Sequence, residues 1–223
     1  MTLALMQDFG IQVDWNEENQ KNLVTIEPQK YQAKKYYVES DWSAASYWYA
    51  LVALAEDDSK IYLTGLKEKS LQGDSILVEM MKPFGVHSTF DQGGVLVQKK
   101  KSVISHFEQD FSDCPDIAQT LAVICASKGI SAHFTGLESL KIKETDRLIA
   151  LQNELQKFGA VLHIKNDSEL LIEAKNLTNS TLAIETYEDH RMAMAFAPLA
   201  FFGKIKIENP MVVVKSYPDF YQD

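Results

Sequence analysis

One pattern recurs three times along the chain, at a spacing of about 75 residues. Each copy ends an amphipathic stretch with a Phe-Gly pair: Phe9-Gly10, Phe84-Gly85 and Phe158-Gly159. The phenylalanines lie 75 and 74 residues apart (84 − 9 and 158 − 84). A glycine directly after an amphipathic stretch is typical of a helix that ends in a left-handed residue. We therefore predict that a helix ends at each pair and that a strand follows.

A second feature keeps the same period. An aspartate precedes an alanine-rich apolar stretch in each copy, at Asp41, Asp116 and Asp189. A carboxylate in that place accepts the unpaired backbone N–H groups of a first helical turn. Each stretch is followed by an alternating segment typical of a strand, at residues 60–63, 131–135 and 204–208.

These features predict about three copies of a unit with two helices and several strands. The period is too long for the common solenoids, so we expect an α/β (α+β) fold whose buried helices are wrapped by sheets. The first copy begins inside its first helix and the last copy ends after its strand. We therefore expect the chain to be part of a longer one.

The chain is acidic, with 22 Lys and Arg against 31 Asp and Glu and a formal net charge of −9. Such a chain has no overall field that attracts nucleic acid or an anionic membrane. No segment reaches the roughly 18 apolar residues that span a bilayer. An anion that binds here has to meet a local cluster of positive side chains.

Neither cysteines nor histidines form a metal-binding pattern, and we predict no metal and no cofactor. Cys114 and Cys125 have no CxxC spacing and are interpreted as free thiols of a reducing, cytoplasmic compartment. There is no Walker loop, GxGxxG or HExxH motif. Four scattered histidines are expected in strands or loops: His87, His106, His133 and His163.

Only two of the 22 basic residues are arginines, Arg147 and Arg191, and each lies in a dense polar motif. The guanidinium group presents a planar fork of donors that suits carboxylate or phosphate. By contrast, the run Lys99-Lys100-Lys101 is expected to be a solvated face or turn.

The first arginine motif spans residues 141–148. If a helix begins near Glu144, then Lys143 and Arg147 share a face, where the two charges repel each other and a bound anion would stabilise both. The alternative is a surface ion pair between Glu144 and Arg147, worth roughly 0–1 kcal/mol. The spacing leaves both interpretations open.

The second arginine motif spans residues 187–195, where charged residues stop as an apolar helix begins. His190 and Arg191 are expected in its first turn, where cations oppose the helix dipole, so their placement favours anion binding over stability. The alternative is that Asp189 caps the helix while His190 and Arg191 face water.

Asp116 and Lys215 are two further candidates. Asp116 follows Pro115 and fits a capping role in a first helical turn. Lys215 ends a run of valines at a predicted strand terminus, where it is either exposed or directed into a cleft.

Together the motifs resemble the signatures of the 5-enolpyruvylshikimate-3-phosphate synthase family. They follow the family's order across nearly the whole chain, at residues 41–47, 71–74, 115–116, 143–148, 189–194 and 215–219. The resemblance implies a transferase of the shikimate pathway, which leads to chorismate and the aromatic amino acids. Its reaction would move the enolpyruvyl group of phosphoenolpyruvate onto the 5-hydroxyl of shikimate 3-phosphate.

The family fold has two similar domains of three βαβαββ units, with the substrates in the cleft between them. The family chain is about twice as long, so the resemblance implies that this is the C-terminal half and that the N-terminal half is a partner. Residues 1–87 would be the last unit of one domain. Residues 88–223 would be most of the other domain and would carry the phosphoenolpyruvate-site motifs. No metal or organic cofactor is implied.

The resemblance also implies residue roles. Asp116 would accept the proton of the attacking hydroxyl, and Glu144, which neighbouring cations should keep ionised, would take part in proton transfer at the methylene carbon. Phosphoenolpyruvate binding is implied for Arg147, His190, Arg191 and Lys215. Shikimate 3-phosphate binding is implied for Ser43, Tyr47, Asp116, Ser139 and Lys143.

Two departures concern the shikimate 3-phosphate contacts: Ala44 replaces a serine that is usual in the family, and Ser139 stands where many members have asparagine. Two alternatives stay open. One is a UDP-N-acetylglucosamine enolpyruvyl transferase of the same fold, and the other is a non-catalytic ligand-binding module.

Overall fold

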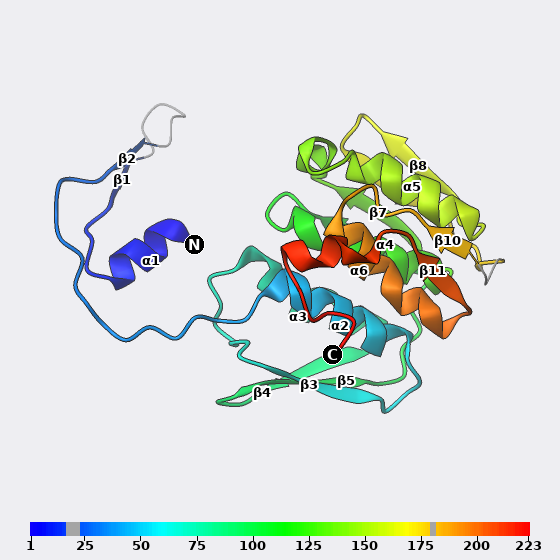
Figure 1. The fold of residues 1–223 in the computed structure, drawn as a ribbon, viewed down its shortest axis with the longest axis horizontal. Coiled ribbons are helices and arrows are strands. Elements are labelled where there is room, and N and C mark those ends of the chain that lie inside the picture. The colour runs from blue at the N-terminus through cyan, green and yellow to red at the C-terminus, as the bar shows by residue number, and fades with distance from the viewer. Residues whose placement is uncertain (17–22, 179–181) are drawn as a thin grey trace.

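The computed structural model describes residues 1–16, 23–178 and 182–223 (Figure 1). Its helices (α), 3-10 helices (η) and strands (β) are α1 (Thr2–Asp8), β1 (Asp14–Asn16), β2 (Leu23–Thr25), α2 (Trp42–Leu54), β3 (Lys60–Thr64), η1 (Gly73–Ile76), α3 (Leu77–Met80), η2 (Lys82–Phe84), β4 (Val86–Phe90), β5 (Gly94–Lys99), β6 (His106–Asp110), η3 (Pro115–Ile117), α4 (Ala118–Ser127), β7 (Ser131–Thr135), η4 (Glu138–Ile142), α5 (Arg147–Lys157), β8 (Leu162–Lys165), β9 (Glu169–Ile172), β10 (Leu182–Ile184), α6 (His190–Phe196), η5 (Ala197–Phe201), β11 (Ile205–Ile207) and η6 (Pro210–Lys215). Within these described ranges, no helix combines the length and apolarity that a bilayer crossing requires.

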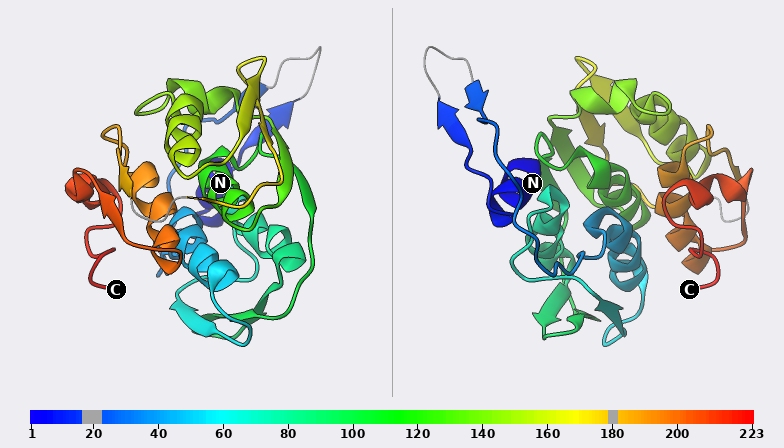
Figure 2. Two further views of the ribbon diagram at one scale, coloured as in Figure 1. Left: turned by 90° about the vertical axis from the view of Figure 1, so that its right-hand side faces the viewer. Right: turned by 60° about the vertical axis from the view of Figure 1, so that its left-hand side comes forward.

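Residues 1–38, here called the N-terminal arm, stand apart from the rest of the chain. Helix α1 and the antiparallel pair of strands β1 and β2 project from the main body, to which an extended segment joins them (Figures 1 and 2). In the described parts of the arm, Ile11 is the single buried residue. The arm therefore has no core of its own.

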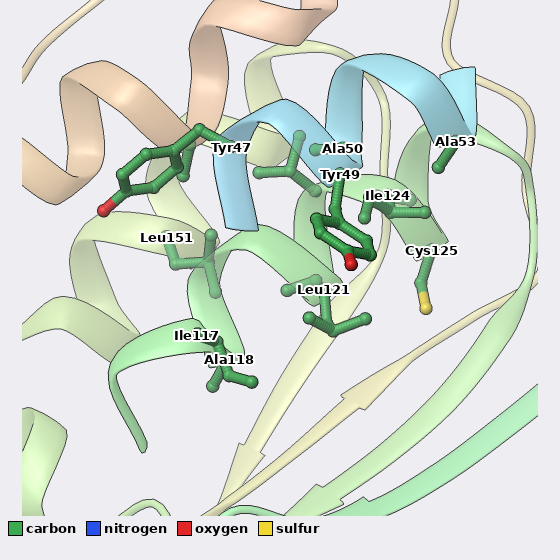
Figure 3. Close-up of a cluster of buried hydrophobic side chains, with 14 of the residues drawn as sticks. Tyr47, Tyr49, Ala50, Ala53, Ile117, Ala118, Leu121, Ile124, Cys125 and Leu151 are labelled. Carbon is green, nitrogen blue, oxygen red and sulfur yellow. The ribbon is translucent and has the colours of Figure 1, made fainter. Parts of the chain in front are cut away.

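Three alanine-rich helices, α2, α4 and α6, form the centre of the main body. All ten residues of α4 are buried, and a helix that is apolar on every side is typical of a protein interior. Small side chains such as Ala50 and Ala118 allow the helices to pack closely. Figure 3 shows side chains of α2 packed against those of α4 and α5. One continuous core runs from Trp42 to Phe220.

Sheets surround this helical centre. Strands β3, β5 and β4 form an antiparallel sheet in that order, and β6, β7, β9 and β8 form a mixed sheet in which β6 and β7 are parallel. Strands β10 and β11 pair in parallel. The run β6-α4-β7-α5-β8-β9 has the complete βαβαββ order. The expected class, repeated α/β units with buried helices, is confirmed.

The repeated glycines and strands predicted from the sequence are present in the structure. Gly10, Gly85 and Gly159 each follow a helix end and have positive φ angles of 86°, 78° and 87°. At Gly85 a Cβ would collide with the carbonyl oxygen of Lys100, so only glycine fits there. The three predicted strands are β3, β7 and β11, and the four scattered histidines lie in β4, β6, β7 and β8. Both cysteines are buried free thiols, as expected.

The condition of a helix start near Glu144 is not met, because α5 begins at Arg147. Asp146 caps this helix by accepting a hydrogen bond from the backbone N–H of Ile149 at 3.2 Å, and aspartate is a far better capping residue than glutamate. Lys143 and Arg147 therefore do not share a helical face.

Two local predictions are wrong. Lys215 ends η6 rather than a strand, since Pro210 fits a helix start and lacks the N–H that a strand needs. Lys99 is only 4% exposed, because the alternation of β5 places it on the buried face with Val95 and Val97. Its amine donates to the carbonyl oxygen of Phe84.

The boundary expected between residues 87 and 88 falls inside β4. The sheet β3-β5-β4 and the continuous core both cross it. In the structure the change from the projecting N-terminal arm to the part with a continuous core comes earlier, just before α2. The assignment of residues 1–87 and 88–223 to two domains stays a prediction.

Candidate active site

Seven charged side chains converge where the central helices begin. They come from the turn before α4, the start of α5, the start of α6 and the end of η6. Every one except Asp189 is a site candidate from the sequence. We call this group the charged cluster: Asp116, Lys143, Glu144, Arg147, Asp189, Arg191 and Lys215.

Arg147 lies at the centre of the cluster and is 1% exposed. Its Nε donates to Asp189 Oδ2 at 2.6 Å, its Nη1 to Asp116 Oδ1 at 3.0 Å and its Nη2 to Glu144 Oε2 at 2.6 Å. A buried guanidinium needs such partners because its desolvation is costly. The alternative of a surface Glu144–Arg147 pair is therefore wrong.

Asp116 joins the two arginines of the chain. Its Oδ1 accepts from Arg147, while its Oδ2 accepts from Arg191 Nη2 at 3.0 Å. Lys143 Nζ lies 3.4 Å from Oδ1. The side chain makes no capping hydrogen bond in η3, so the capping role predicted for it is not observed. Burial opposes ionisation, but Arg191, Lys143 and Arg147 outweigh it and hold the pKa of Asp116 below its ordinary value.

Glu144 links Arg147 to Lys215 at the solvent edge of the cluster. Lys215 Nζ donates to Glu144 Oε1, and the Lys215 side chain is 58% exposed. The hydrogen bond from Lys215 is the largest cause that lowers the pKa of Glu144 to about 2, with Arg147 contributing in the same direction against burial. Glu144 is therefore ionised at neutral pH, as its cationic neighbours predicted.

The start of α6 is capped and buried. Asp189 Oδ1 accepts from the backbone N–H of Arg191 at 2.8 Å, which confirms the predicted cap. The side chains of His190 and Arg191 are only 7% and 14% exposed, so they do not face water. Burial lowers the pKa of His190. Its Nδ1 has no hydrogen-bond partner among the described residues and lies 3.8 Å from Asp189 Oδ1.

Ser43 and Tyr47, two predicted shikimate 3-phosphate ligands, lie on α2 and have protein partners. Ser43 Oγ donates to Asp74 Oδ2. Tyr47 is 1% exposed, its hydroxyl lies 3.5 Å from Arg191 Nη1, and burial raises its pKa to about 12. Phe220 packs edge-on against its ring, with the centroids 6.0 Å apart.

Ser139 lies in η4 and is partly buried. No hydrogen bond joins Ser139 to the charged cluster in the part of the chain that is described. Of the five predicted shikimate 3-phosphate ligands, the structure brings Asp116 and Lys143 into the cluster and Tyr47 to its edge beside Arg191.

Sequence reasoning missed two acids. Asp189 was expected only to cap α6, yet it also binds Arg147; its position beside His190 and Arg191 was the available signal. Asp74 lies in the motif at residues 71–74, but no binding or catalytic role was predicted for it. Burial raises its pKa, and the charges of Asp116 and Arg191 act on it as well.

The cluster has four cations and three carboxylates, a net charge of +1. Among the described residues, no three His, Cys, Asp or Glu side chains are grouped as a metal site requires. A cavity of about 580 Å³ runs along α2 and β3, but no residue of the cluster lines it. An anion that binds the cluster therefore competes with the carboxylates that already accept from its cations.

Comparison with known proteins places this geometry in context. The family model described as EPSP synthase (3-phosphoshikimate 1-carboxyvinyltransferase) matches residues 1–223. The 3-phosphoshikimate 1-carboxyvinyltransferase of Bacteroides fragilis is 45% identical over 225 residues, covering 100% of this chain and 54% of the relative. That of Methanospirillum hungatei is 32% identical, covering 100% of this chain and 51% of the relative.

Solved structures share the fold. EPSP synthase from Acinetobacter baumannii superposes with a TM-score of 0.77 at 21% identity, over 99% of this chain and 52% of that one. The enolpyruvyl transferase NikO from Streptomyces tendae gives a TM-score of 0.68 at 13% identity, over 99% and 50%. The chain spans about half the length of the curated relatives that it matches.

Replacing the buried guanidinium should destabilise the chain far more than replacing an exposed cation. Arg147→Leu leaves three carboxylates without their shared partner and is expected to lower the free energy of unfolding by about 3–5 kcal/mol. The control Lys141→Leu removes an exposed ion pair with Asp167 and should cost less than about 1 kcal/mol. Urea unfolding of the three proteins measures both; equal losses would contradict the central role of Arg147.

The low pKa of Glu144 predicts a stability change in acid. Because this pKa is about 2 when folded and about 4.3 in an unfolded chain, the contribution of Glu144 is complete above that unfolded value and is lost as the pH falls towards 2. Glu144→Gln should destabilise the chain at pH 6, by about 1 kcal/mol or less given its partial exposure, and the difference should vanish near pH 2.

The matched control is Glu138→Gln, which changes an exposed glutamate in the neighbouring η4. Urea unfolding measured at several pH values should give a smaller pH dependence for this variant. A Glu144→Gln effect that stays constant from pH 6 to pH 2 would refute the ionised pair.

Proposed function

Because the chain belongs to the EPSP synthase family, we propose that it carries the phosphoenolpyruvate-binding part of an enolpyruvyl transferase site. The reaction transfers the enolpyruvyl group from phosphoenolpyruvate to the 5-hydroxyl of shikimate 3-phosphate and releases phosphate. The observation that carries the proposal is that the only two arginines of the chain meet at one carboxylate, Asp116.

The residue types suit the chemistry. Both substrates are polyanions, and Arg147, Arg191 and Lys215 would hold phosphoenolpyruvate while Lys143 binds shikimate 3-phosphate, which offsets the repulsion between the substrates. His190, next to Arg191, would complete the phosphoenolpyruvate site.

Proton transfers complete the reaction. In the addition step a proton joins the methylene carbon, the 5-hydroxyl oxygen bonds to the neighbouring carbon, and Asp116 takes the hydroxyl proton. In the elimination step the new methyl group loses a proton, and the C–O bond to phosphate breaks. Glu144 would exchange the proton at the methylene carbon. To act as an acid it has to lose its pairing with Lys215, which an anionic substrate would achieve by taking that lysine.

The remaining assignments concern the acceptor. Ser43, Tyr47 and Ser139 are proposed to contact shikimate 3-phosphate together with Asp116 and Lys143. Ser43 and Tyr47 would first have to exchange their present partners, Asp74 and Arg191. Their contribution is therefore proposed to be smaller than that of Lys143.

We propose that the complete site needs more than these 223 residues, since the chain spans about half the length of its curated relatives. The motifs within residues 88–223 would face a second domain across the substrate cleft. The family's N-terminal Lys-Ser pair, its Gly-rich loop and its Ser-Ser-Gln segment have no counterpart in these 223 residues. The place of action would be the cytoplasm.

Phosphoenolpyruvate titrated into the chain tests the binding assignment. Arg191→Leu and Lys215→Leu should each weaken binding about tenfold, because each removes charge-assisted hydrogen bonds. The matched control is Lys206→Leu, which changes an exposed lysine of β11 that pairs with Glu208. This variant should bind phosphoenolpyruvate with unchanged affinity. Calorimetry measures all four proteins, and equal affinities would refute the assignment.

Added shikimate 3-phosphate should tighten phosphoenolpyruvate binding, whereas UDP-N-acetylglucosamine should not. The reverse result would favour the alternative transferase. Phosphoenolpyruvate binding that neither acceptor affects would favour a non-catalytic binding module.

Turnover by the 223-residue chain is a separate test. Mixed with both substrates, the chain should release no phosphate above the rate in buffer, because cationic and hydroxyl groups of the missing segments would be required. A phosphate-release assay checks this. Release that disappears in the Asp116→Asn variant would show that these residues suffice.

A further inference from the structure

Asp189 has two functions in the fold, and each oxygen of its carboxylate has a separate partner. Oδ2 accepts from Arg147 Nε at 2.6 Å, and Oδ1 accepts from the backbone N–H of Arg191 at 2.8 Å. Oδ1 also lies 3.5 Å from Arg147 Nη2. The residue is 0% exposed. One buried carboxylate therefore holds both arginines, one by its side chain and the other by its backbone.

These contacts restrict the orientation of the Arg147 guanidinium and the place from which the Arg191 side chain starts. A carboxylate on the Nε edge fixes the plane of a guanidinium because the donors form a rigid fork. The same carboxylate fixes the backbone of Arg191 in the first turn of α6. From these positions both arginines reach Asp116 at 3.0 Å.

Capping alone does not explain the burial of Asp189. Asp41 occupies the equivalent place before α2 and caps it in the same way, accepting from Ser43 N at 2.7 Å. Yet Asp41 is exposed and makes no ion pair within the described residues. Burying a carboxylate is costly unless a cation pairs with it. The contact with Arg147 is thus a second function, added to the cap.

We infer that Asp189 is a positioning residue that sets the mutual orientation of Arg147 and Arg191, so that both face one small anionic group. This inference deepens the proposed function and rests on it for the identity of that group. The geometric part concerns only the hydrogen bonds of the chain, and it can be measured without turnover.

The two arginines offer a direct measurement, because arginine-selective ¹⁵N labelling gives one Nε–Hε signal for each. Arg147→Lys and Arg191→Lys assign the two signals. Asp189→Asn keeps a good capping residue but removes the charge that Arg147 Nε meets. Exchange of the Arg147 Hε proton with water should accelerate about tenfold, as expected for a lost charge-assisted hydrogen bond.

The matched control is Asp41→Asn, which should change Arg147 Hε exchange by less than about twofold, since it leaves every contact of Arg147 in place. Equal acceleration in Asp189→Asn and Asp41→Asn, or none in either, would overturn the inference. If Asp189→Asn does not fold, the inference is tested by a measurement on the unsubstituted chain instead. A through-hydrogen-bond coupling between Arg147 Nε and the Asp189 carboxyl carbon is expected, and its absence with fast Hε exchange would overturn the inference.

Titration of phosphoenolpyruvate into the same labelled chains separates the two hypotheses. In the unsubstituted chain the Nε–Hε signals of both arginines should shift as phosphoenolpyruvate is added. In Asp189→Asn the change in the Arg147 signal should be smaller by about half or more, and its Hε exchange should be faster. If no arginine signal shifts in the unsubstituted chain, the proposed function fails. The exchange rates still decide the role of Asp189.

Discussion

A buried guanidinium group needs carboxylates around it, and in this chain Arg147 has three. They come from η3, from the loop between η4 and α5 and from the cap of α6, which lie far apart in the sequence. Removing a charge from water costs several kcal/mol unless its partners are well placed. The hydrogen bonds from Arg147 to these three carboxylates therefore fix the N-terminal ends of α4, α5 and α6 relative to one another. Every other contact of the charged cluster, including the bridge from Asp116 to Arg191, depends on that arrangement.

Much of the fold could be predicted because its signals are local. The Phe-Gly pairs mark helix ends through the left-handed residue at Gly85 and its equivalents, and the aspartates at positions 41 and 189 cap helices as expected. The scarcity of arginine indicated two of the residues that converge in the charged cluster, while their binding roles stay a prediction. Burial could not be predicted in this way, because it depends on residues distant in sequence. Lys99 was expected to be solvated, and a surface position was one of the two alternatives left open for Arg147 and His190. Packing of the sheet and the central helices buries all three residues.

The cluster neutralises most of its own charge, and this affects what it can bind. Its cations already contact Asp116, Glu144 or Asp189. An incoming anion competes with these carboxylates for the same donors. Asp189 is the least replaceable of the three, since it is fully buried and also caps α6. Glu144 and Asp116, which are partly exposed, are the carboxylates that a ligand can displace.

The repeat has a consequence for the three aspartates that open the central helices. Asp41 caps α2, Asp116 pairs with both arginines and Lys143 without capping, and Asp189 both caps α6 and binds Arg147. Asp41 and Asp189 are extended residues that precede their helices, whereas Asp116 lies inside η3, so the same spacing in the sequence leads to different local structure. Comparing the repeated aspartates within one chain therefore distinguishes the residue that only caps a helix from those that bind the cations of the charged cluster. A single helix start would not show this difference.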